Sequence, residues 1–140
     1  MKYLRSLAIA GMTLVGVSVD AQEAGTYLCT IDRVDSPDNV HPKVKVKRDA
    51  NYLGKRFTVN RATGVMSGAL NNAYKRLPTV IDVGSTSNSF KAVTTMLLSE
   101  GYGAGTNIHA LTVMEFVSEP RKPFVYLWNS EIFYGTCENL

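Results

Sequence analysis

Only two cysteines occur in the chain, and they stand near its opposite ends, Cys29 in GTYLCTIDRV and Cys137 in IFYGTCENL. In a small exported domain, two cysteines most simply form one disulfide. Both lie in strand-like stretches, and bridging requires Cα atoms roughly 4.4–6.8 Å apart. The spacing therefore predicts that the first and last strands are tied together, as neighbours or face to face.

The start of the chain predicts an oxidising compartment for that bond. Two cations precede an apolar run of signal-peptide length, and the run ends in the sequence VDA, whose small last residue suits a signal peptidase. The run is too short and carries too many glycines for a membrane span. We therefore expect residues 1–21 to be a cleaved signal peptide and residues 22–140 to form one periplasmic or secreted domain, with no stable membrane anchor left after cleavage.

Strand-like stretches fill the rest of the chain. They are rich in Val, Ile, Thr, Phe and Tyr and occupy residues 26–34, 43–48, 56–60, 65–67, 79–83, 89–97, 108–117, 123–129 and 131–137. Residues 68–77 show no clear apolar stripe, which predicts a loop or a single helical turn. The pattern predicts one all-β, antiparallel domain. Because the terminal strands are joined, we expect a closed or nearly closed barrel, with a β-sandwich as the alternative.

A basic stretch, KVKVKR, gives the first candidate binding surface. On the strand expected there, Lys43, Lys45 and Lys47 share one face, and Arg48 follows them. Such a stripe suits an anionic partner such as lipid A or a cell-wall polymer. The alternative is a solvated face that protects a strand edge. The whole-chain net charge of +3 is too small to favour nucleic acid.

An aromatic row gives the second candidate surface. Phe124, Tyr126 and Trp128 fall on one face of the strand expected at 123–129. Tyr126 and Trp128 could form a platform for a ligand or partner. The alternative places the row in the core, with one of these two rings partly exposed.

No catalytic or metal-binding constellation occurs in the sequence. The histidines are His41 and His109, and no Cys/His/carboxylate cluster has the spacing of a metal site. Glu115 stands alone in an apolar stretch and is expected on the solvent face. A deep pocket joining His109 to a carboxylate and a hydroxyl would indicate an enzyme, whereas a buried, singly hydrogen-bonded His109 would argue against one. The sequence predicts a non-catalytic domain without a metal or a cofactor.

The stretches FTVNRATGVMSG, VIDVGSTSNSFK and PFVYLWNSEIFYGTCE resemble a group of small exported, periplasmic proteins of Gram-negative bacteria for which no activity is known. The shared features are Tyr27 with Cys29, a Thr-Gly turn, an Asp-x-Gly-Ser stretch and a closing Gly-Thr-Cys. The resemblance implies bacterial export and a disulfide-bonded all-β domain.

A second resemblance is to the periplasmic C-type lysozyme inhibitors, and it rests on Ser67-Gly68-Ala69. Asn71 stands where their inhibitory segment has tyrosine. Together, these features predict an exported β-domain that binds an unknown protein or envelope component. The alternatives are a small-ligand carrier with a barrel cavity, which a side-chain-filled interior would exclude, and a lysozyme-inhibitor-like protein.

Overall fold

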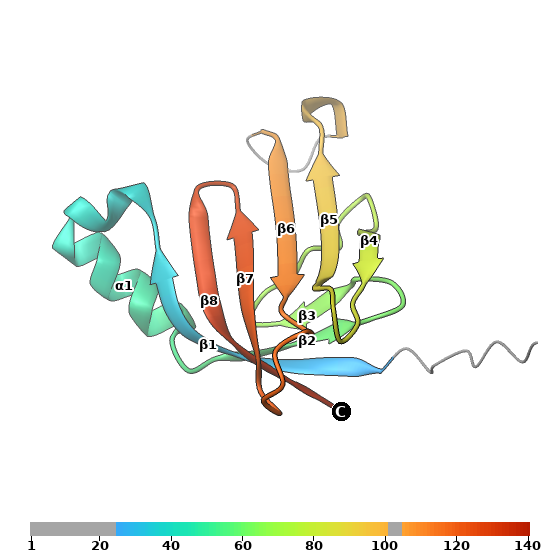
Figure 1. Ribbon diagram of the computed structural model, residues 1–140. Coiled ribbons are helices and arrows are strands. Elements are labelled where there is room, and N and C mark those ends of the chain that lie inside the picture. Colours follow the sequence, from blue (N-terminus) through green and yellow to red (C-terminus); the bar gives the residue numbers. More distant parts are fainter. Residues whose placement is uncertain (1–24, 101–104) are drawn as a thin grey trace, which may run out of the picture.

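A computed structural model describes residues 25–100 and 105–140, and Figure 1 shows a curved sheet with a helix at one side. The expected signal peptide, residues 1–21, lies outside the described residues. The strands are β1 (Thr26–Asp35), β2 (Arg56–Asn60), β3 (Met66–Gly68), β4 (Thr79–Val83), β5 (Phe90–Met96), β6 (Asn107–Val113), β7 (Lys122–Trp128) and β8 (Glu131–Asn139). The helical elements are α1 (Pro42–Tyr52) and two 3-10 turns, η1 (Pro37–Val40) and η2 (Leu98–Glu100).

The strands form one antiparallel sheet in the order β3-β2-β1-β8-β7-β6-β5-β4. β1 and β8, the first and last strands, pair inside the sheet, and every other neighbouring pair is consecutive in the chain. The predicted all-β fold with joined terminal strands is confirmed. β3 and β4 form opposite edges of the sheet, and residues 69–78 carry the chain between them. The sheet is therefore a half-barrel that stays open between β3 and β4.

The strand predicted for residues 43–48 is wrong, because these residues lie within α1. Pro42 takes the first helical position, where its fixed φ and missing N–H suit a helix start. Helical periodicity places Arg48 and Tyr52 on one side, and the Tyr52 ring meets Phe133 of β8 edge-on at 5.0 Å. The alternating valines reflect no buried strand face, since Val46 is 68% exposed.

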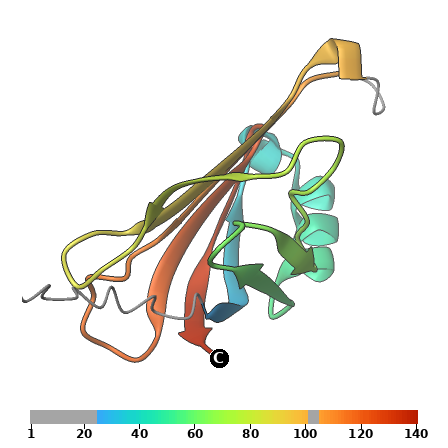
Figure 2. The same cartoon turned by 90° about the vertical axis from the view of Figure 1, so that its right-hand side faces the viewer.

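Side chains fill one face of the half-barrel. Figure 2 shows α1 and the β2–β3 hairpin on the same side of the sheet. Large side chains, each at most 2% exposed, lie on this filled face: Tyr27, Phe57, Leu70, Phe90, Leu111, Phe124, Tyr126 and Phe133. The predicted aromatic row thus belongs to the core, with Trp128 partly exposed at its end. No helix or strand of the described residues lies over the opposite face of β1 and β5–β8 in Figure 2, and we call it the bare face.

The disulfide lies in the interior of the sheet. Cys29 and Cys137 are direct cross-strand partners on β1 and β8, with their Cα atoms 3.9 Å apart and no exposed surface. The bond therefore locks the one strand pair that joins the two ends of the chain.

Gly135 of β8 lies where the sheet leaves no space for a side chain. A Cβ atom at this position would lie 1.9 Å from the Thr30 carbonyl oxygen and 2.8 Å from Cε1 of Phe124. The register of the adjoining strand β1 shifts between Ile31 and Arg33, beside this residue. Glycine here lets the Phe124 ring cross over the backbone of β8.

Breaking the disulfide is expected to lower the free energy of unfolding by about 4 kcal/mol, because the bond closes a long loop in the unfolded chain. The cysteines are 108 residues apart. Urea unfolding of Cys29→Ser and Cys137→Ser measures the loss, and reduced wild type is the control. Equal unfolding midpoints for the oxidised wild type and the variants would contradict a stabilising bond.

Gly135→Val is expected to lower the free energy of unfolding by roughly 3 kcal/mol or to prevent folding, because the new side chain overlaps backbone. Gly25→Ala is the matched control, since its Cβ would meet only the Leu140 carbonyl oxygen at 3.6 Å. Thermal unfolding followed by circular dichroism compares the two variants. Similar melting temperatures for both would show that the sheet yields at Gly135.

Candidate functional site

A groove of about 600 Å³ lies between α1 and the start of β8. It is lined by Asp38, Lys43, Val44, Lys47, Arg48, Asn51, Tyr52 and Glu131. The groove thus brings together three of the four cations that the sequence predicts as a surface for an anionic partner. Their roles in the structure differ.

Arg48 is a structural residue and not part of an exposed surface, which corrects the prediction made for it. Its side chain is 6% exposed. Nε donates to Oε1 of Glu131 at 2.8 Å, and Nη1 donates to Oδ1 of Asn39 at 2.5 Å. Helical geometry turns Arg48 toward the sheet, where Glu131 largely balances its charge. Its guanidinium group thereby links α1 to η1 and to β8.

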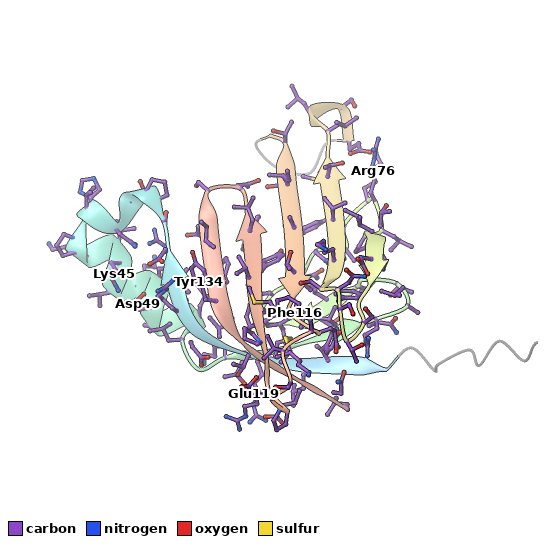
Figure 3. All side chains as sticks on the ribbon, in the orientation of Figure 1. Lys45, Asp49, Arg76, Phe116, Glu119 and Tyr134 are labelled. Carbon is purple, nitrogen blue, oxygen red and sulfur yellow. A yellow bond between two sulfur atoms is a disulfide. The ribbon has the colours of Figure 1, made fainter. Side chains whose placement is uncertain are left out.

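The three lysines do not form one stripe, because a helix separates residues that a strand would align. Lys45 forms an ion pair with Asp49, one turn later, and Figure 3 shows the two side by side on α1. Lys43 and Lys47 lie one turn apart on the wall of the groove, and neither has an ion-pair partner among the described residues. Lys43 and Lys47 thus line the groove without an ion pair of their own, together with the carboxylate of Asp38.

A smaller hollow of about 250 Å³ adjoins the groove on the side of the β7–β8 turn. Its lining residues are Ser36, Asp38, Asn107, Trp128, Asn129, Ser130 and Glu131. Asp38 and Glu131 border both depressions, so the groove and the hollow adjoin each other. The β7–β8 turn is tight, with Asn129 at φ 52° and its Oδ1 accepting from the Ile108 N–H at 3.0 Å. Trp128, the only tryptophan of the chain, therefore lies beside fixed polar groups.

Tyr126 is fully buried, so its prediction as a partner surface is wrong. Its hydroxyl shares a 2.5 Å hydrogen bond with Nδ1 of His109, and burial raises the pKa of Tyr126. His109 is 1% exposed and stacks on the Trp128 ring at a centroid distance of 5.8 Å. Among the described residues, its Nε2 and the Oγ1 of the cross-strand neighbour Thr94 have no hydrogen-bond partner. The pair Tyr126 and His109 supports Trp128 from inside and does not meet solvent.

Tyr52 contributes a neutral hydroxyl to the groove. Burial and the nearby Glu131 carboxylate raise the pKa of Tyr52. The groove therefore offers cations at Lys43 and Lys47, a carboxylate at Asp38 and a neutral hydrogen-bonding group at Tyr52, and the adjoining hollow offers the Trp128 ring.

Asp38 and Glu131 are groove residues that sequence reasoning missed. The Ser-Pro pair at 36–37 and the His-Pro pair at 41–42 would have indicated Asp38, because proline favours the first position of a helical turn. Placing two helical turns there would have brought Asp38 and α1 beside each other.

No family model, curated protein or solved structure matches the chain. In residues 25–100 and 105–140, no helix is long and apolar enough to cross a membrane. Within the same ranges, no three His, Cys, Asp or Glu side chains gather as metal ligands. The fold and the groove define a disulfide-bonded, all-β half-barrel with a charged depression at one end.

Stability is expected to fall as the pH is lowered below about 6.5, the ordinary pKa of histidine. Burial lowers the pKa of His109, so the folded protein binds fewer protons than the unfolded chain in this range. Urea unfolding between pH 7.5 and 5 measures the loss, and Trp128 fluorescence should be quenched as the stacked imidazole is protonated. His109→Phe should flatten both profiles, whereas His41→Phe should leave them as in wild type; an unchanged profile in His109→Phe would assign the effect elsewhere.

Proposed function

We propose that the protein is an exported, non-catalytic β-domain that binds an anionic glycan of the cell envelope. The proposed binding site is the groove together with the adjoining hollow. The observation that carries this proposal is that the groove lined by Lys43 and Lys47 adjoins the hollow lined by Trp128.

The groove and the hollow suit different parts of a charged sugar chain. Trp128 offers an aromatic surface on which a sugar ring can stack, as aromatic rings commonly do in ligand sites. Ser130 and Asn107 place hydrogen-bonding groups beside it for sugar hydroxyls. Lys43 and Lys47 supply charge for a phosphate or carboxylate on the same chain. The proposed ligand is therefore a sugar that carries an anionic group.

Export is supported by the signal-like start of the chain and by the buried disulfide, since such bonds persist in oxidising compartments. A non-catalytic role is supported by the contacts of the groove carboxylates. A glycosidase needs two carboxyl groups that flank the scissile bond. Of the two in the groove, Glu131 is instead engaged by the guanidinium of Arg48.

The other candidate functions have less support. The filled face weighs against a carrier, because Phe57, Phe90 and Phe124 occupy the space that a barrel cavity would need. The lysozyme-inhibitor-like motif lies on and beside the edge strand β3. There Gly68 has φ 120°, and a Cβ would meet the Arg56 carbonyl oxygen at 2.9 Å. Backbone geometry is thus a sufficient reason for that glycine.

The double variant Lys43→Gln/Lys47→Gln is expected to weaken glycan binding by about 25-fold, since each lysine at an anionic surface contributes about 1 kcal/mol. Isothermal titration calorimetry with lipopolysaccharide core oligosaccharide and with soluble peptidoglycan fragments measures the change and separates phosphate-bearing from carboxylate-bearing glycans. Lys45→Gln is the matched control, because Lys45 is held by Asp49 outside the groove.

Trp128→Leu should also weaken binding while leaving the salt dependence of affinity unchanged. If Lys45→Gln lost as much glycan affinity as the double variant, the effect would come from the overall charge of the protein and not from the groove. Absence of binding by the wild type to both glycans would overturn the proposal.

A further inference from the structure

Both signs of charge occur in the lining of the groove and the adjoining hollow. Arg48 and Glu131 form an ion pair there, with Nε and Oε1 2.8 Å apart. The other charged groups of the lining are the carboxylate of Asp38 and the ammonium groups of Lys43 and Lys47. Within residues 25–100 and 105–140, these three side chains take part in no ion pair. They are therefore the groups that can pair with charges on a ligand, two as cations and one as an anion.

Asp38 lies where the groove and the hollow adjoin. It lines both depressions, whereas the two lysines line only the groove and Trp128 lines only the hollow. The backbone of Asp38 is held in η1, where its N–H donates to Oγ of Ser36 at 3.4 Å and its carbonyl oxygen accepts from the His41 N–H at 3.0 Å. A ligand that reaches from Trp128 to the lysines therefore passes the Asp38 carboxylate.

The sizes of the two depressions agree with a ligand that spans them. Ligand sites commonly measure about 300–1,000 Å³. The groove, at about 600 Å³, lies within this range, whereas the hollow, at about 250 Å³, lies below it. The hollow therefore has room for one part of a ligand, and the remainder extends past Asp38 into the groove.

We propose that the ligand is an amino sugar that carries both an anionic group and a protonated amine, and that Asp38 recognises the amine. This inference rests on the proposed function and narrows the class of glycan that the site binds. A sugar with only an anionic group places like charge beside the Asp38 carboxylate, which lowers its affinity. A protonated amine replaces that repulsion with a charge-assisted hydrogen bond. Asp38 thus selects by attraction and by repulsion, as specific sites commonly do.

Paired sugars that differ only in acetylation of the amine test this preference in the protein recovered from the periplasm. The probes are glucosamine 6-phosphate and N-acetylglucosamine 6-phosphate, because acetylation removes the charge of the amine and keeps the phosphate. Trp128, the only tryptophan of the chain, reports binding through its fluorescence. At about pH 7 we expect the wild type to bind the amine-bearing sugar about fivefold more tightly, which is the upper end of the effect of an exposed ion pair.

Asp38→Asn is expected to remove this preference by weakening the binding of glucosamine 6-phosphate, since asparagine keeps the shape of the side chain and loses its charge. Asp35→Asn is the matched control, because Asp35 pairs with Arg33 on β1 and does not line the groove. It should keep the fivefold ratio. At about pH 9 the wild type should also lose the ratio, because an amine with the ordinary α-amino pKa of about 7.7–8.0 is then mostly neutral.

A second pair, muramic acid and N-acetylmuramic acid, separates a carboxylate-bearing ligand from a phosphate-bearing one. A wild type that binds both members of each pair equally, or that binds none of the four sugars, would overturn the inference. An Asp38→Asn protein that keeps the ratio would overturn it as well. Binding of the larger glycans that depends on Lys43 and Lys47 would still stand in each of these cases, so the two proposals fail separately.

Discussion

Pairing of β1 with β8, locked by the disulfide between Cys29 and Cys137, is the constraint on which the rest of the structure depends. It brings the two ends of the chain into the interior of the sheet, so the middle of the chain must supply both edges, β3 and β4. Residues 69–78 then have to cross between those edges. Buried Asn72 holds the crossing, because its side chain accepts from the Met66 N–H and donates to the Gly64 carbonyl at 2.8 and 2.9 Å. The disulfide at the centre of the sheet thereby determines where residues 69–78 must run.

The two faces of the half-barrel differ in what covers them. The filled face takes the large aromatic side chains, and the groove lies beside it, between α1 and the start of β8. The bare face keeps apolar residues that no element of the described chain covers in Figure 2. Apolar surface left in water costs free energy, so the filled face supplies most of the hydrophobic stabilisation.

Three polar side chains at or near the core are explained only by partners distant in sequence. Glu115, expected on the solvent face, accepts from the Tyr27 hydroxyl and lies 3.5 Å from Nη2 of Arg61. Arg48 likewise finds Glu131, and His109 finds Tyr126. Burying such polar groups costs free energy unless they are hydrogen-bonded. Each of these contacts therefore holds one element in place against the sheet. The contact of His109 with Trp128 extends this ordering to the wall of the hollow.

The sequence by itself determined the strand-rich class and the neighbourhood of the terminal strands, because alternation and cysteine count act locally or through one covalent bond. It also predicted Lys43, Lys45, Lys47, Arg48, Tyr126 and Trp128 as candidate binding residues. Only the tertiary structure decided that residues 43–48 are helical, that Arg48 and Tyr126 are buried, and that the groove lined by Lys43 and Lys47 adjoins the hollow lined by Trp128. The physical reason is that β8, more than 80 residues away from α1, supplies the Glu131 and Phe133 contacts that select the helix.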